Sequence, residues 1–299
     1  MHDVYAYGVI APSTLIELVD EFPNAGGYAE IATVHPSIGG EAAGGAYVLA
    51  RLGIATKLAG NRLGDDDSSA RVRQVLAAAG VDCSAIGLEP DSSPVTEVVI
   101  AGGAARTVFG TYRKLAADQA WNEPSRDDVR TSRIVCLDPF FGASSQQVAD
   151  WCVEAGIPYV TVDVAPGTEI ARHAEVLVIS EEFTGCTLST ADAHEVVAGY
   201  VEHCSGLVLL TRGGRRLISA RRGEQSREHE PFAVDMRDTT GAGDSFRAGI
   251  IYGMLQGYLD DELVRTASAV AAMVCERVPG VVNSPTGTEL IEFLDRSAP

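Results

Sequence analysis

Short apolar segments alternate along the chain with longer segments in which apolar residues recur at helical spacing. The short segments predict strands at residues 4–10, 55–60, 134–137, 159–163, 176–179 and 207–211. The longer segments predict helices within residues 36–53, 61–80, 144–155, 191–204, 245–258 and 260–277. From residue 134 onward the strands are continuous apolar runs, which are typical of a parallel sheet covered by helices on both faces. The predicted fold class is therefore α/β, doubly wound, with a mostly parallel sheet between helices.

A second pattern interrupts this alternation in two places. Residues 28–34 are extended after a turn with two glycines, and residues 95–101 and 106–112 are β-rich runs around Gly102 and Gly103. Two such runs with a glycine pair between them predict a β-hairpin. Exposed strand edges with apolar side chains are typical of a surface that pairs with another element.

Composition narrows the class of protein. At 299 residues with 46% hydrophobic content, the chain suits one large α/β domain that spans residues 1–299. The net charge of -18 argues against nucleic-acid or anionic-membrane partners. No apolar run reaches the ~18 residues of a membrane span, and the first residues lack signal-peptide features, so we expect a cytoplasmic protein. Six cysteines without a CxxC pair indicate reduced core thiols.

Some polar and small residues indicate structure instead of chemistry. The acidic residues 65–67 could suggest a metal cluster, but acids are common in the first turn of a helix. Asp138 and Asp163 follow strands, where turn-forming Asp is common, and we assign them no chemical role. Glycines at 249, 253 and 257 share one helical face, which predicts close contact with a neighbouring element.

The strongest chemical motif is DTTGAGDSF at residues 238–246. It places Gly241, Ala242 and Gly243 at the first turn of a helix, where backbone N–H groups lack partners and attract anions. Asp244 then stands beside this anion site, where a carboxylate can remove the proton of a hydroxyl that attacks a phosphate.

The motif has two other interpretations. One is a tight strand-to-helix turn in which Asp244 is only an N-terminal cap. The other is a nicotinamide-binding motif, which is excluded because Phe246 stands where the last glycine is needed.

The whole of DTTGAGDSF resembles the signature near the C-terminus of the ribokinase-like, or PfkB, family of carbohydrate kinases. The resemblance implies that Asp244 is the general base and that the amides of Gly241, Ala242 and Gly243 hold the charge of the transferred phosphoryl group. It also implies ATP and Mg²⁺ as cofactors, with a monovalent cation as a further candidate. Inserted strands, here within about residues 10–36 and 94–115, would form a lid over the sugar and the contact of a homodimer.

The segment GGEAAGG resembles the family's first signature, GGxxxNxA, whose glycines border the sugar. Gly39 and Gly40 are therefore expected at the substrate, and no Lys-Ser or Lys-Thr follows them as in a P-loop. Gly44 replaces the family's substrate-binding Asn, and the family's sugar-gripping Asp aligns with Thr14 or with nothing. These departures predict that the sugar contacts are partly remade.

Two arginines of the predicted hairpin are further substrate candidates, Arg106 and Arg113. The run YRK, which contains Arg113, resembles a lid segment of 2-keto-3-deoxygluconate kinases that meets the substrate acid. Arg is suited to holding a carboxylate through two parallel hydrogen bonds. The alternative is that these are solvated surface cations.

The nucleotide side is predicted from looser resemblances. LLTRGG resembles the family's TxGxxG segment, which implies nucleotide contacts at Thr211 and Gly213 and an exposed hairpin for the arginines beyond. The last long helix flanks adenine in relatives, which makes Ala271 and Cys275 candidates. ISEEF stands where the family carries NxxE, so Glu182, or Glu181 in its place, is expected to organise Mg²⁺ through water.

The sequence thus predicts an ATP-dependent phosphotransferase that acts on a hydroxyl of a sugar-like molecule. A sugar-acid kinase of the 2-keto-3-deoxygluconate type and a nucleoside kinase of the same superfamily remain alternatives. A sugar-binding protein that kept the fold and lost catalysis is a third.

Overall fold

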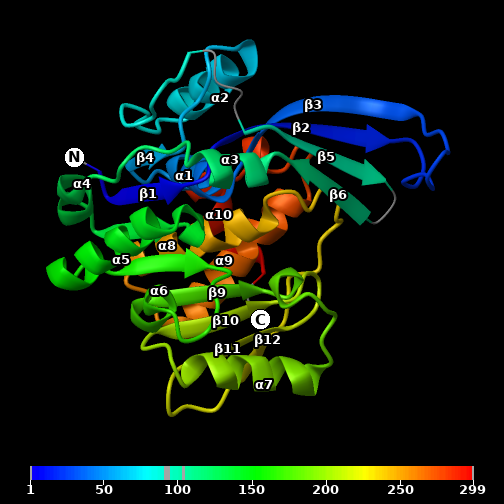
Figure 1. The fold of residues 1–299 in the computed structure, drawn as a ribbon. Helices are drawn as coiled ribbons and strands as arrows, with labels where there is room; N and C mark the ends of the chain where they lie inside the picture. Colours follow the sequence, from blue (N-terminus) through cyan, green and yellow to red (C-terminus); the bar gives the residue numbers. More distant parts are fainter. Residues whose placement is uncertain (1, 91–94, 103–104, 298–299) are drawn as a thin grey trace.

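The computed structural model describes residues 2–90, 95–102 and 105–297, and within them the main sheet has the strand order β12-β11-β10-β9-β8-β7-β1-β4 (Figure 1). The strands β10, β9, β8, β7, β1 and β4 are parallel, and β11 and β12 are antiparallel additions at one edge. The bounds are β1 Val4–Gly8, β4 Thr56–Gly60, β7 Ile134–Leu137, β8 Tyr159–Val162, β9 Val176–Ser180, β10 Leu207–Thr211, β11 Leu217–Ala220 and β12 Arg227–His229. The predicted α/β class with a mostly parallel sheet is confirmed.

Helices cover both faces of this sheet and bury a separate apolar cluster on each. Side chains alternate along a strand, so Val4 and Ala6 of β1 join one cluster while Tyr5 and Tyr7 join the other. The first face carries α1 Glu41–Arg51, α2 Asp67–Ala78, α8 Ala242–Gln256, α9 Asp260–Cys275 and α10 Gly287–Arg296. The second carries α4 Arg126–Thr131, α5 Ala143–Ala155, α6 Glu169–His173 and α7 Thr190–Val201. Short 3-10 turns complete the path at η1 Pro139–Phe141, η2 Glu182–Thr184 and η3 Val281–Asn283.

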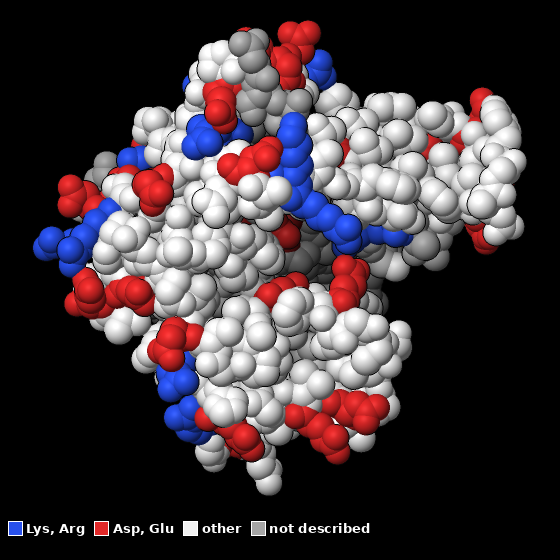
Figure 2. All heavy atoms as spheres, viewed as in Figure 1, with Lys and Arg blue, Asp and Glu red and all other residues white. Residues whose placement is uncertain are grey.

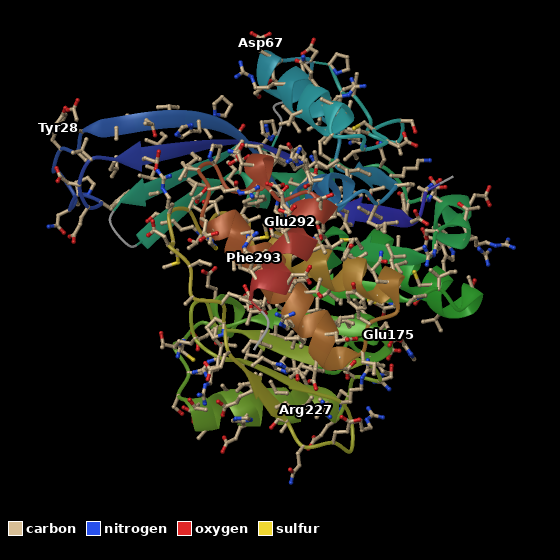
Figure 3. All side chains as sticks on the ribbon, turned by 180° about the vertical axis from the view of Figure 1, so that it is seen from behind. Tyr28, Asp67, Glu175, Arg227, Glu292 and Phe293 are labelled. Carbon is tan, nitrogen blue, oxygen red and sulfur yellow. The ribbon has the colours of Figure 1, made fainter. Side chains whose placement is uncertain are left out.

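A second sheet, the lid, projects to one side of the main body (Figure 1). Its order is β3-β2-β5-β6, with bounds β2 Ala11–Leu18, β3 Ile31–Gly39, β5 Glu97–Gly102 and β6 Ala105–Gly110. Seen from behind, Tyr28 marks the far end of this sheet and Phe293 lies on α10 over the main body (Figure 3). The outer part of the lid leaves large apolar side chains exposed, among them Ile31, Val34, Val108 and Phe109.

Two of the bounds predicted for the lid need correction. The extended segment predicted at residues 28–34 is β3, which starts later and runs on to Gly39 because it pairs with β2 over that length. The strand predicted at 106–112 stops at Gly110, and Tyr112 begins helix α3 (Tyr112–Asp118). A Cβ on Gly110 would lie 2.3 Å from the Tyr112 ring, so a glycine at this position allows the chain to pass from β6 into α3.

The predicted turn at Gly102 and Gly103 reaches beyond the described residues.

Helices α8 and α9 pack closely, as the glycine spacing predicted. A Cβ on Gly249 would lie 2.6 Å from the Cα of Ala267, and one on Gly253 would lie 3.5 Å from the Cα of Leu263. Gly257 differs, because it caps α8 with a φ of 77° and a Cβ there would meet nothing. The glycines therefore allow α9 to approach the helix that begins at the DTTGAGDSF motif.

Among the described residues, no helix is both long and apolar enough to cross a bilayer. The six cysteines are free thiols, and Cys136, Cys152 and Cys204 are buried in the core. Asp66 caps α2 by accepting hydrogen bonds from the N–H groups of Ser68 and Ser69, which confirms the helix-start interpretation of residues 65–67.

Candidate active site

The DTTGAGDSF turn is held by side-chain to backbone hydrogen bonds. Asp238 Oδ1 accepts from Thr240 N at 2.8 Å, and its Oδ2 accepts from Gly280 N at 2.9 Å. Gly241 has a φ of 72°, and a Cβ there would lie 2.1 Å from Cγ2 of Val281. Only glycine fits this position without displacing a neighbour.

The turn leaves backbone donors open. Ala242 N–H donates to the Thr239 carbonyl, whereas the N–H groups of Gly241 and Gly243 donate to no other described residue. A Cβ on Gly243 would have no neighbour within 4 Å, so this side of the turn is accessible. Free amides at a helix start form a site for an anion.

Asp244 follows these amides in the first turn of α8. Burial raises its pKa to about 7; Arg247 opposes this rise, and Asp138 and Glu97 add to it. A carboxylate with a pKa near neutrality is suited to act as a general base.

Beneath Asp244 lies an ion pair that the sequence analysis did not identify. Arg247 Nη1 donates to Asp138 Oδ1 at 2.6 Å, and both side chains are 0% exposed. Asp138 Oδ2 accepts from the N–H groups of Val9 at 2.8 Å and Ala42 at 3.0 Å. Asp138 therefore ties β1, β7, α1 and α8 together. The sequence feature that could have indicated this ion pair is Arg247 itself, an arginine among the apolar residues that follow the motif.

The glycine pair at the end of β3 borders a second acidic group, Glu97 of β5. A Cβ on Gly39 would lie 2.5 Å from Glu97 Oε1, and one on Gly40 would lie 2.4 Å from the Val9 carbonyl oxygen. Glu97 is buried and accepts hydrogen bonds from Ser13 Oγ, at 2.7 Å, and from the Tyr112 hydroxyl. Glu97 was not predicted, because only the pairing of β2 with β5 brings it beside Gly39.

Glu41 adds another carboxyl group directly after the glycine pair. Burial, together with Asp138 and Asp244, raises its pKa to about 8. The side of the site that borders Gly39 and Gly40 is therefore rich in carboxyl groups.

Gly44 lies directly against the candidate base. A Cβ on Gly44 would lie 3.0 Å from Asp244 Oδ2, whereas the nearest atom to a Cβ on Gly45 would be 3.7 Å away. The Asn expected from the family signature therefore does not fit here unless Asp244 moves.

We predict that Gly44→Asn, which restores the family residue, lowers kcat about tenfold to hundredfold, because small displacements of a catalytic group are costly. Steady-state kinetics on the best acceptor measure this, with Gly45→Ala as the control on the same helix. Equal or higher activity in Gly44→Asn would show that the base tolerates a side chain at this position.

The structure separates the lid candidates. Arg106 reaches the main body, where Nη1 donates to the Thr239 carbonyl and Nη2 lies 3.7 Å from Glu182 Oε1. Arg113 is exposed on α3 and forms no hydrogen bond or ion pair with another described residue. In β2, Ser13 points to Glu97, so Thr14 lies on the opposite face of the strand.

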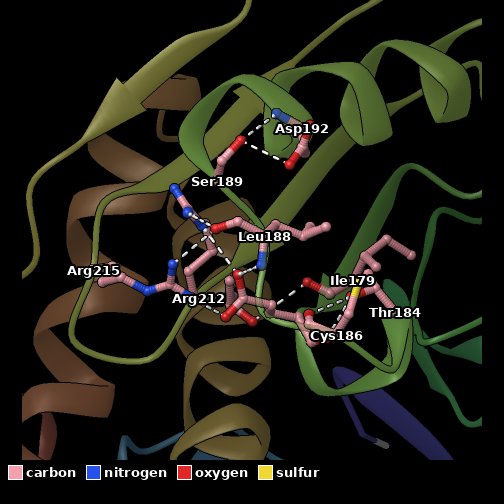
Figure 4. Close-up of polar contacts among 10 residues, drawn as sticks. Ile179, Thr184, Cys186, Leu188, Ser189, Asp192, Arg212 and Arg215 are labelled. Atoms are coloured by element: carbon pink, nitrogen blue, oxygen red, sulfur yellow. Dashed lines mark hydrogen bonds and ion pairs between the residues drawn. The ribbon is translucent and has the colours of Figure 1, made fainter.

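On the nucleotide side, Glu181 and Glu182 differ sharply. Glu181 accepts from Leu188 N at 3.0 Å and pairs with Arg212 and Arg215 (Figure 4). Burial alone would raise its pKa, but these partners lower it overall. Glu182 is 86% exposed, which leaves it as the member of the pair that is available to a metal.

The other nucleotide candidates surround the same end of the sheet. Thr211 ends β10 with its hydroxyl 3.4 Å from the Ile179 carbonyl, and Gly213 has a φ of 61°. The Cys275 carbonyl accepts from the N–H groups of Arg237 and Asp238, so the end of α9 adjoins the motif. Ala271 is one turn earlier on α9 and packs partly against the core.

Figure 2 shows the molecule hollowed below the lid, with acidic and basic side chains around the hollow. A separate cavity of about 590 Å³ lies near the starts of β8 and β9, lined in part by Tyr159, Val176 and Arg221. None of the predicted site residues lines that cavity. Ligands of parallel α/β sheets bind at the opposite, C-terminal ends of the strands.

No group of three metal-binding side chains occurs within the described ranges. The exposed carboxylate of Glu182 could hold Mg²⁺ that arrives with phosphates, since protein sites often hold such an ion through one or two carboxylates.

The lidded parallel sheet, the open glycine turn and the adjacent carboxylate define a small-molecule kinase of the ribokinase-like class. The family model described as pfkB family carbohydrate kinase matches residues 1–286. The chain therefore belongs to the PfkB family of carbohydrate kinases, as its motif predicted.

Individual relatives agree with this assignment. The chain is 27% identical to the ATP-dependent ribose-1-phosphate kinase of Halopiger xanaduensis, over 92% of this chain and 93% of that protein. It is 26% identical to a nucleoside kinase of Methanothermobacter thermautotrophicus, over 97% and 94%. Arabidopsis thaliana ribokinase, solved with ribose and ATP, has a TM-score of 0.81 and 22% identity, with 98% of each chain covered.

Proposed function

We propose that this protein transfers the γ-phosphoryl group of ATP to a hydroxyl of a neutral, sugar-like acceptor. The observation that carries the proposal is the pair of free amides, Gly241 and Gly243, directly before Asp244. Asp244 takes the hydroxyl proton as the acceptor oxygen bonds to phosphorus. The bond from that phosphorus to the bridging oxygen breaks, and ADP leaves with the electron pair. The open amides offset charge on the phosphoryl oxygens, which is the main requirement of this reaction.

Mg²⁺ would offset further phosphate charge, with Glu182 as its outer partner on the protein. Thr211 and Gly213 are proposed nucleotide contacts because they lie at and just after the C-terminal end of β10. Ala271 and Cys275 are proposed because they lie in the last turns of α9, where the Cys275 carbonyl accepts from the N–H of Asp238 in the motif. A monovalent cation stays a predicted additional cofactor.

The carboxyl groups favour a neutral acceptor over a sugar acid. Glu97 borders Gly39, and Asp244 must be a carboxylate to act as the base, so an acceptor carboxylate would meet like charges at close range. Among the described residues, Arg106 donates to Thr239 and lies near Glu182, and it forms no hydrogen bond or ion pair with Glu97. We therefore place the acceptor against Gly39, Gly40 and Glu97, where Glu97 takes the sugar-gripping role expected near Thr14.

A nucleoside is the second candidate acceptor, and the similarity to the archaeal nucleoside kinase favours it. The similarity to a ribose-1-phosphate kinase suggests a ribosyl group as the common element. A nucleoside and a ribosyl sugar both present hydroxyl groups, and neither carries a carboxylate that the site would have to bind.

We further propose a homodimer formed through the lid. The exposed apolar side chains of β3 and β6 would be covered by a second copy. One domain over residues 1–299 and a cytoplasmic location also stay predictions.

The test is ADP release from Mg-ATP with D-ribose, D-fructose, 2-keto-3-deoxygluconate, ribose-1-phosphate, adenosine, guanosine and inosine. We expect turnover with a neutral sugar or a nucleoside and little with 2-keto-3-deoxygluconate. Faster turnover of the sugar acid would refute the neutral acceptor. Silence across the panel, with ligand-induced thermal stabilisation, would favour a binding protein instead.

A further inference from the structure

Arg106 connects the lid to two separate elements of the main body. It lies on β6, where it pairs in register with Ala101 of β5. Its Nη1 donates to the carbonyl of Thr239 in the motif turn, and its Nη2 lies 3.7 Å from Glu182 at the start of η2. A lid side chain thus reaches the turn that carries the free amides.

The position of Arg106 is on the phosphate side of Asp244. Thr239 precedes the open amides of Gly241 and Gly243, and Glu182 follows β9 at the end of the sheet assigned to the nucleotide. The acceptor side is built from other residues, namely Ser13, Gly39 and Glu97. The contacts of the guanidinium are therefore with the motif turn and η2, and not with the residues proposed to hold the acceptor.

The positive charge of Arg106 can offset the negative charge of an incoming nucleotide. An incoming triphosphate would approach the carboxylate of Asp244, and like charges at close range would oppose it. Arg247 cannot compensate at the surface, because it is fully buried and bound to Asp138. Arg106 approaches from the lid side and is 27% exposed. It also opposes the rise in the pKa of Asp244.

A purely structural ion pair explains these contacts less well. The partner Glu182 is 86% exposed and 3.7 Å away, and such pairs contribute little to stability. A guanidinium has five N–H donors, and only one of them forms a hydrogen bond to a described residue. The remaining donors are available to a ligand.

We propose that Arg106 is a catalytic residue that binds the phosphoryl group during transfer, an inference that rests on the proposed kinase function. Its free donors contact the non-bridging oxygens while the acceptor oxygen bonds to phosphorus and ADP leaves. Arg106 itself neither gains nor loses a proton in this step. Because it is carried by the lid, closure over the acceptor completes the site.

The kinetic test compares Arg106→Ala and Arg106→Lys with Arg216→Ala, using Mg-ATP and the best acceptor of the panel. Arg216 is a matched control, because it is an exposed arginine that pairs with Glu228 and Glu230. We expect Arg106→Ala to lower kcat about 10²–10³-fold with little change in acceptor KM, as for loss of a transition-state donor. Lys should restore part of the rate, since it returns the charge without the planar fork. An effect on acceptor KM alone, or no more loss than in Arg216→Ala, would overturn the proposal.

A second test does not depend on finding the acceptor. ADP, Mg²⁺ and aluminium fluoride together imitate the transferred phosphoryl group, and thermal unfolding reports their binding. We expect the wild type and Arg216→Ala to gain stability over ADP and Mg²⁺ alone, and Arg106→Ala to lose that gain. An equal gain in Arg106→Ala, or no gain in the wild type, would overturn the assignment of Arg106. The kinase proposal itself fails separately, if the wild type phosphorylates no acceptor in the panel.

Discussion

Replacement of Asp244 by Asn is expected to reduce kcat about 10²–10⁴-fold while the protein still folds and binds Mg-ATP. Asn is nearly isosteric with Asp but cannot accept the hydroxyl proton, and a positioned base contributes rate of this order. ADP release measures turnover, and calorimetric titration with Mg-ATP measures binding. Asp238→Asn is the control. It removes a carboxylate that holds the motif turn, so we expect it to lower nucleotide binding as well as turnover.

The pH dependence provides a second signature of the same residue. The basic form of Asp244 is the carboxylate, and burial raises its pKa to about 7, so kcat/KM should increase as the pH rises through neutrality. Glu41 titrates close by with a raised pKa, so the observed value belongs to the pair. Arg247 and Arg106 lower the pKa of Asp244, whereas Asp138 and Glu97 raise it.

Stability should respond in the opposite sense. A raised folded-state pKa means that folding favours the neutral acid, so this contribution is complete below the unfolded pKa and is lost as the pH rises through about 7. Asp244→Asn should therefore raise the melting temperature more at pH 8 than at pH 6. A variant with near wild-type turnover and an unchanged pH profile would show that Asp244 is not the base.

Replacement of Arg247 by Met is expected to lower the free energy of unfolding by about 3–5 kcal/mol, since it leaves a buried carboxylate without its partner. The side chains of Asp138 and Arg247 are both 0% exposed, and Arg247 Nη1 lies 2.6 Å from Asp138 Oδ1. Urea unfolding at pH 7 measures the effect. Arg126→Met is the control, because Arg126 pairs with Glu154 at a site where both side chains are more than half exposed.

A double variant separates the ion pair from lost packing. Asp138→Asn together with Arg247→Met removes the charge that the single variant leaves uncompensated, so we expect it to be more stable than Arg247→Met alone. If the double variant is no more stable, or if Arg247→Met costs no more than Arg126→Met, the buried charge pair is not what stabilises this region.

Local sequence was sufficient for the elements that depend on neighbouring residues. The continuous apolar strands of the parallel sheet and the long helices α5, α7, α8 and α9 were predicted to within a few residues, whereas the short helices α4 and α6 were not predicted. Errors occurred where pairing decides the outcome, as in β3, whose length is set by β2. Tyr112 was placed in a strand because the helix α3 has no strong start signal of its own.

The candidate site likewise contains residues that are neighbours in the sequence and residues that only the fold brings together. The sequence by itself determined the open turn at Gly241 and Gly243 and the adjoining Asp244, because these groups are consecutive in the chain and their geometry follows from one helix start. Only the tertiary structure decided that Asp138 binds Arg247, 109 positions away, and that Glu97 lies beside Gly39. It also brought Arg106 across from the lid to Thr239. These contacts depend on strand order and on the approach of two sheets, which no local pattern of residues specifies.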